Sequence, residues 1–185
     1  MKDVVIVYSG KNLSYFQNQG GIGYWAVQSS RIRQAKYILV IRNLNEAWAV
    51  RDGVAQGQAF FLGKISGCSD KTPHKGRKLI LISEYALLSQ DDALFLNAWE
   101  KLTGGQRYPV AYLSQQEVLD KLAFNVASPE LQWYSFEVAN SPEIAVQEIQ
   151  QETVKSLADV IAEAKEKIAN AAGVDSGKIS IQIHY

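Results

Sequence analysis

The stretch 77–86 reads RKLILISEYA, and the stretch 59–67 upstream of it reads AFFLGKISG. Both are rich in β-branched, aromatic and large apolar residues, a composition typical of strands. A polar connection with Gly, Ser, Asp and Pro separates them, which predicts an antiparallel pair joined by a long loop. A third run of the same kind, GYWAV at 23–27, precedes both. Together the three runs predict a sheet or small barrel that carries aromatic side chains.

Further strands and short helices are expected around these runs. The residue patterns predict strands at 4–8, 37–41 and 131–138 and a helical segment at 91–102. A short helix ending at Lys36 is predicted to be capped by Ser29 or Ser30 and to bury Ile32 and Ala35. Another helix, ending at Leu122, should begin with a capping box formed by Ser114 and Glu117. The polar segment 11–21 is predicted to be a loop.

The sequence changes character after residue 140. Strong helix formers fill 142–172, with apolar residues at helical spacing, and Ile179, Ile181 and Ile183 then alternate with polar residues. This pattern predicts a helix followed by a strand. We therefore expect an α+β protein with a core domain over 1–140 and a C-terminal helix–strand appendage over 141–185.

Composition favours a cytoplasmic protein of ordinary globular type. The 185 residues include a single cysteine, Cys68, which excludes an internal disulfide framework. No apolar run approaches the roughly 18 residues that a membrane helix needs. The first residues read as a strand and not as a signal peptide. These features predict no membrane partner and a reducing compartment.

The net charge of zero conceals an asymmetry between the two parts of the chain. Residues 1–78 contain 12 Lys and Arg against 4 Asp and Glu, whereas residues 79–185 contain 7 against 15. A basic half can form a face for nucleic acid. The alternative is that the two oppositely charged halves attract each other within one fold.

The sequence offers little for catalysis. The two histidines, His74 and His184, do not lie at metal-ligand spacing, and no phosphate loop or nucleophile elbow is found. Cys68 lacks an identifiable base, and such cysteines are usually inert. We expect no catalytic residue, metal or cofactor, and rank an enzyme acting on a small nucleotide-like substrate below the binding functions.

Candidate binding residues come from the aromatic strands and the basic half. A ligand is expected to contact Tyr24, Trp25, Trp48, Ser83 and Tyr85. Aromatic rings stack on bases, and alternation along a strand puts Ser83 and Tyr85 on one face, where they can bind a base edge. The expected contacts to a nucleic-acid backbone are Arg42, Lys64, Lys75, Arg77 and Lys78. The alternatives are that the aromatic residues pack in the core, as we expect for Trp99, and that the basic loop is merely solvated.

The region from Gly23 to about Phe136 resembles an EVE-type domain of the PUA-like superfamily. The resemblance rests on Tyr24-Trp25, on the segment 60–67 and on the run Ile82 to Ala86. It is closest to uncharacterised bacterial proteins with a Gly-Tyr-Trp-Ala strand, some of them encoded near defence genes. It implies a small β-barrel with flanking helices, and an aromatic pocket that binds a modified base.

The resulting expectation is a non-catalytic nucleic-acid-binding module that reads a modified or flipped base in DNA or RNA. The alternative is a protein-interaction or oligomerisation module. In that case the acidic C-terminal helix and the strand at 179–183 would bind a protein partner or a second copy by strand addition.

Overall fold

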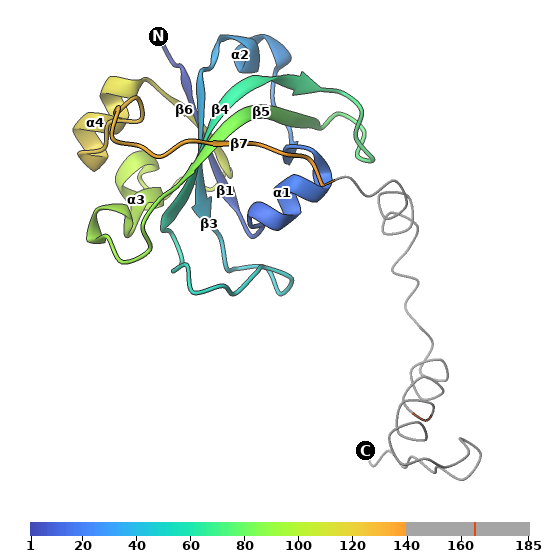
Figure 1. Cartoon of the computed structure of the whole chain (residues 1–185), viewed down its shortest axis with the longest axis horizontal. Helices are drawn as coiled ribbons and strands as arrows, with labels where there is room; N and C mark the ends of the chain where they lie inside the picture. Colours follow the sequence, from blue (N-terminus) through green and yellow to red (C-terminus); the bar gives the residue numbers. More distant parts are fainter. Residues whose placement is uncertain (140–164, 166–185) are drawn as a thin grey trace. The chain divides into compact units, whose positions relative to one another are not determined.

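The computed structural model describes residues 1–139 together with Lys165. Residues 1–139 form a mixed α+β unit built on one seven-stranded sheet that curls into a half-barrel (Figure 1). The predicted appendage at 141–185 and its boundary with the core domain lie outside the described residues. Within the described part of the chain, no helix has the length and apolar character needed to cross a membrane.

Six strands of the sheet follow the order β2-β5-β4-β3-β1-β6, and β7 pairs with β5 off this path. Their bounds are β1 Val4–Ser9, β2 Ile22–Trp25, β3 Tyr37–Arg42, β4 Ala59–Ser69, β5 Lys78–Leu87, β6 Val110–Leu113 and β7 Tyr134–Ser135. β1 and β3 are parallel, whereas all other neighbours are antiparallel. The path ends at β2 on one side and at β6 on the other, so these two strands form edges.

Helices cover both faces of the sheet. They are α1 Leu13–Gln19, α2 Ser29–Gln34, α3 Ala98–Thr103 and α4 Gln115–Leu122, with a 3-10 turn η1 at Ala93–Phe95. α1 and α2 contribute Phe16 and Ile32 to one apolar cluster, and α3 and α4 contribute to another. Figure 1 shows α3 and α4 together, away from α1 and α2.

β1 shows how the sequence pattern builds this layered core. Val4 and Ile6 belong to the cluster with α3 and α4, whereas Val5 and Val7 belong to the cluster with α1 and α2. All four side chains are fully buried. A continuous apolar run is therefore needed here, because both faces of the strand are covered.

The predicted strands at 4–8, 23–27, 37–41, 59–66 and 78–83 are confirmed, with small differences at their ends. The antiparallel pairing of the β4 and β5 regions is also confirmed. The strand expected at 131–138 is reduced to the two residues of β7. This short β7 bonds to β5 at only two registered positions.

The prediction of a loop at 11–21 is wrong, because this segment contains α1. The Asn12 side chain accepts the Tyr15 amide at the N-terminus, and Gly20 ends the helix with a φ of 72°. Phe16 is fully buried against Phe61, with 5.4 Å between ring centroids. Such burial is worth roughly 1.5–3 kcal/mol and stabilises a helix whose other residues are mostly polar.

Two helix ends also differ from the prediction. Gln28 precedes α2 without a side-chain cap, and Ser29 and Ser30 lie within its first turn, although Ile32 and Ala35 are buried as expected. The segment 91–102 is divided by Asn97, whose φ of 54° separates η1 from α3. The capping box that begins α4 is confirmed, with both reciprocal hydrogen bonds present.

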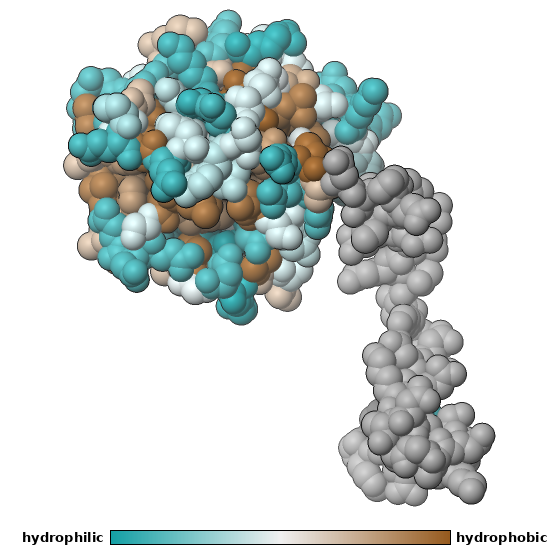
Figure 2. Space-filling view, viewed as in Figure 1, coloured by the Kyte–Doolittle hydropathy of each residue, from teal (hydrophilic) through white to brown (hydrophobic). Residues whose placement is uncertain are grey.

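Figure 2 shows apolar side chains gathered in a band across the middle of the visible face, below β7. Not every aromatic side chain is buried. Of the four tryptophans, Trp48 is exposed over 56% of its surface, whereas Trp25 and Trp99 are buried. As predicted, Trp99 lies in the core, where it stacks on Tyr8 with 4.5 Å between ring centroids.

Candidate functional site

Basic and aromatic side chains converge at the β2 edge of the sheet, around Tyr24. The His74 ring meets the Tyr24 ring edge-on at 5.3 Å between centroids. Arg77 donates from Nη1 to the Tyr24 carbonyl oxygen over 3.0 Å. The Lys11 Nζ lies 5.1 Å from the centroid of the Tyr24 ring. The four residues come from three separate segments of the chain, and we call them the Tyr24 cluster.

Lys11 is the most constrained member of the Tyr24 cluster. Its Nζ donates to the Gln19 Oε1 and to the Gly23 carbonyl oxygen, each over 3.0 Å. Burial lowers the pKa of Lys11 from its usual 10.5 to about 8. No carboxylate forms an ion pair with Lys11 in the described part of the chain. Its ammonium group is therefore held by neutral oxygens, and one of its three N–H donors has no acceptor among residues 1–139.

The turn between β4 and β5 supplies the other cationic groups of this edge. The Arg77 amide donates to the His74 carbonyl oxygen over 3.1 Å, and Gly76 adopts a φ of 75° that favours glycine. Lys75 is exposed on this turn, as are His74 and Arg77. Lys78 lies at the start of β5 and is paired with Asp70, so its charge is balanced.

The exposed Trp48 lies beside the strand end that carries Lys11. A Cβ built on Gly10 would lie 3.0 Å from Cζ3 of the Trp48 ring and 2.9 Å from the Ala49 Cβ. Only glycine permits this approach, because real Cβ atoms do not come so close. Trp48 is thereby placed next to the residue that precedes Lys11.

Arg42, at the end of β3, has a structural environment. Its side chain is fully buried and donates to the Gly10 and Lys11 carbonyl oxygens and to both oxygens of Asp52. Its guanidinium also lies 4.3 Å from the centroid of the Phe60 ring. Burial lowers the pKa of Arg42, and Asp52 opposes this effect. Arg42 therefore links the ends of β1 and β3 to the loop that carries Trp48.

Lys64 lies apart from the Tyr24 cluster. It forms an ion pair with Glu84 on β5, and its Nζ is 4.3 Å from the centroid of the Trp133 ring. This pair joins the basic and acidic parts of the sequence, as does the pair between Lys2 and Glu117. Of the four ion pairs in the described part of the chain, these two join the basic and acidic halves, and the other two lie within the basic half.

The remaining aromatic candidates do not join Tyr24. Trp25 is 8% exposed and packs in the cluster with α1 and α2, where its Nε1 has no hydrogen-bond partner among the residues that the structure describes. Tyr85 is half-buried and stacks on Phe61 at 5.4 Å between centroids. Register shifts between β4 and β5 put Ile82 and Tyr85 in the same cluster, although they are three residues apart. Simple alternation, which paired the exposed Ser83 with Tyr85, therefore does not hold here.

Sequence reasoning missed two members of the Tyr24 cluster, Lys11 and His74. The only local signal for Lys11 is a lysine directly after a buried strand and a glycine. For His74 the signal is its place in the basic loop at 71–78, which was considered as a clamp for a nucleic-acid backbone, although His74 was not itself selected as a contact. No group of three or more His, Cys, Asp or Glu suited to a metal ion occurs within the described residues.

Comparison of the chain with models of protein families, with curated proteins and with solved structures gave no match.

Proposed function

We propose that this unit is a non-catalytic nucleic-acid-binding module of the PUA-like, EVE-related type, which holds a modified or flipped base. The observation that carries the proposal is the convergence of Lys11, His74 and Arg77 on Tyr24. Basic groups around an aromatic ring suit a ligand that carries both phosphates and bases. The curled sheet with flanking helices agrees with a PUA-like half-barrel and adds support.

Lys11 and Arg77 are assigned to the phosphates. The third N–H donor of Lys11 and the remaining guanidinium donors of Arg77 can bind phosphate oxygens, and Lys75 on the same turn adds charge. Lys11 has no carboxylate partner in the described part of the chain. An anion bound there would therefore stabilise the charged form of Lys11, which burial disfavours, without breaking an existing ion pair.

Trp48 is assigned to the base. Its ring is largely exposed and lies against Gly10, next to Lys11 in the chain. Stacking of a base on an aromatic side chain contributes about 1–3 kcal/mol. Trp25 and Tyr85, the other aromatic candidates, already pack against core side chains. The base site is therefore placed nearer to the ends of β1 and β3 than the strand pattern alone suggested.

Titration with short single-stranded oligonucleotides at low salt, followed by tryptophan fluorescence, tests this proposal. The set should include DNA and RNA, each with unmodified and with methylated bases. We expect binding to weaken about tenfold in Lys11→Met and in Arg77→Gln, and each change to reduce the salt slope by about 0.7. Arg107→Gln, which removes an exposed charge outside the Tyr24 cluster, is the matched control and should bind normally. Absence of binding to every oligonucleotide, or equal binding by all variants, would refute the proposal.

A further inference from the structure

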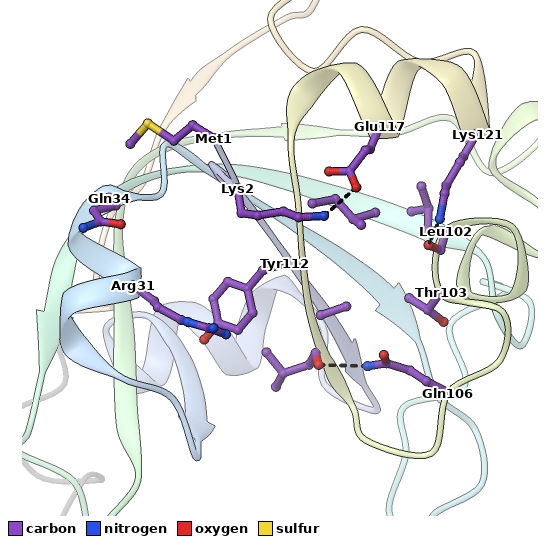
Figure 3. A pocket seen from close by; sticks show the side chains of 13 residues that line it. Met1, Lys2, Arg31, Gln34, Leu102, Thr103, Gln106, Tyr112, Glu117 and Lys121 are labelled. Carbon is purple, nitrogen blue, oxygen red and sulfur yellow. Dashed lines mark hydrogen bonds and ion pairs between the residues drawn. The ribbon is translucent and has the colours of Figure 1, made fainter.

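A groove runs along β6, the edge of the sheet at the opposite end of the strand order from β2. It has a volume of about 800 Å³ and is lined by all four residues of β6, by Arg31 and Gln34 of α2, and by residues of α3 and α4. Figure 3 shows Arg31 beside the Tyr112 ring on one side and Lys2 reaching Glu117 on the other. The two walls are thus helices from opposite faces of the sheet, and the strand edge lies between them.

The backbone of β6 has hydrogen-bonding groups that point into this groove. The Pro109 carbonyl oxygen accepts the Tyr8 amide of β1, whereas the Val110 carbonyl oxygen accepts the Gln106 side-chain amide over 2.9 Å. Successive residues of a strand present these groups to opposite sides, so Tyr112 shares the outward side with Val110. The Tyr112 amide and carbonyl have no hydrogen-bond partner among the described residues.

The side chains around the groove favour an acidic ligand. Lys2, Arg31 and Lys121 line it against the single carboxylate of Glu117, which is paired with Lys2. The Arg31 guanidinium lies 4.9 Å from the centroid of the Tyr112 ring and has no hydrogen-bond acceptor in the described part of the chain. A planar guanidinium held over a ring in this way can bind a carboxylate through two parallel hydrogen bonds.

We propose that the β6 edge binds an extended acidic peptide, which adds to the sheet as a further strand. Its backbone would pair with the outward amide of Val110 and with the outward amide and carbonyl of Tyr112, in the way that extended peptides add to sheet edges elsewhere. Glutamate or aspartate at alternate positions would face Arg31, because Tyr112 and Arg31 lie on the same side of the sheet. β6 spans about 13 Å, which fits four residues of such a peptide. This function is separate from the one proposed for the Tyr24 cluster.

Four fluorescent hexapeptides, in which glutamate alternates with alanine, valine, leucine or tyrosine, provide the test. At least one should bind with a Kd of about 10–100 μM, and the amide signal of Tyr112 should shift in NMR spectra. Arg31→Gln should weaken binding at least fivefold. Arg33→Gln, a change of an exposed arginine on the same helix, should have no effect.

A second variant tests the backbone pairing without changing any charge. Val110→Pro removes an outward amide without removing a bond to β1, and proline is tolerated at such edge positions. It should weaken binding, while circular dichroism confirms that the protein is folded. The proposal is overturned if none of the peptides binds, if lysine versions bind equally well, or if a single-stranded oligonucleotide displaces the peptide from the groove.

Discussion

Two basic groups, the fully buried Arg42 and the half-buried Lys11, lie near the ends of the parallel strands β1 and β3, and they differ in how their charge is balanced. Arg42 forms an ion pair with Asp52 and donates to two carbonyl oxygens. Lys11 is held by a side-chain amide and a carbonyl oxygen and has no carboxylate partner among the described residues. Removing one partner of such a buried ion pair destabilises the fold, because the other charge is left uncompensated. A partly buried charge without a counter-ion lowers stability and is therefore available for an anionic ligand.

The largest expected difference between Arg42 and Lys11 is in the effect of their substitution on the free energy of unfolding. Arg42→Met should lower the free energy of unfolding by about 3 kcal/mol, because it leaves Asp52 and two carbonyl oxygens without their donor. Lys11→Met should leave stability unchanged or raise it, since it removes an unbalanced charge and keeps the apolar stem. Urea unfolding measures both variants. A comparable loss of unfolding free energy in the two variants would show that Lys11 stabilises the fold as much as Arg42 does.

Substitution of Trp48 should weaken oligonucleotide binding and leave the stability of the fold nearly unchanged. Trp48→Ala should change the free energy of unfolding by less than about 0.5 kcal/mol, because the ring is mostly exposed. The same change should weaken oligonucleotide binding by about 1–3 kcal/mol if a base stacks on the ring. Isothermal titration calorimetry gives the second value. The matched variant is Trp133→Ala, which removes a ring that contacts Lys64 outside the Tyr24 cluster and should spare binding.

The pH dependence of stability should show a smaller effect of Lys11. Its pKa is about 8 in the folded protein and 10.5 when unfolded, so the unfolded state binds more protons between these values. The contribution of Lys11 to the free energy of unfolding should therefore increase as the pH rises above 8. The increase should reach roughly 1 kcal/mol at about pH 9.5, after allowance for solvent screening. Burial raises the pKa of Tyr8, Tyr24 and Tyr112, which opposes the rise only near pH 10 and above. Lys11→Met should lack the rise, and an identical profile in this variant would assign it to another group.

The sequence predicted the parts of the fold whose stability comes from apolar runs and local hydrogen bonds. The β4 and β5 runs and the Ser114–Glu117 capping box are examples, since strand composition and helix capping are visible within a few residues. α1 was missed because its main apolar contact, that of Phe16 with Phe61, joins distant segments. No strand was predicted at β6, whose four residues are too few for a clear alternation.

The candidate site was harder to predict than the fold. Tyr24, Trp48 and Arg77 were chosen for their residue types, and the structure places Arg77 against Tyr24 and Trp48 beside Gly10. The importance of Lys11 depends on its distance from Gly23 and on burial, and neither can be read from a lysine in a polar segment. The same holds for the opposite role of Arg42, whose partner Asp52 is ten residues away in an irregular loop.

Direct titration of the Lys11 ammonium group by NMR, with and without a single-stranded oligonucleotide, tests the central claim. The free protein should give a pKa of about 8 for Lys11. A bound phosphate should raise this value by at least about one unit, because the anion stabilises the protonated form. Lys101, an exposed lysine on α3, serves as the internal control and should not shift. An unchanged pKa of Lys11 in the presence of saturating oligonucleotide would contradict the assignment of Lys11 to nucleic-acid binding.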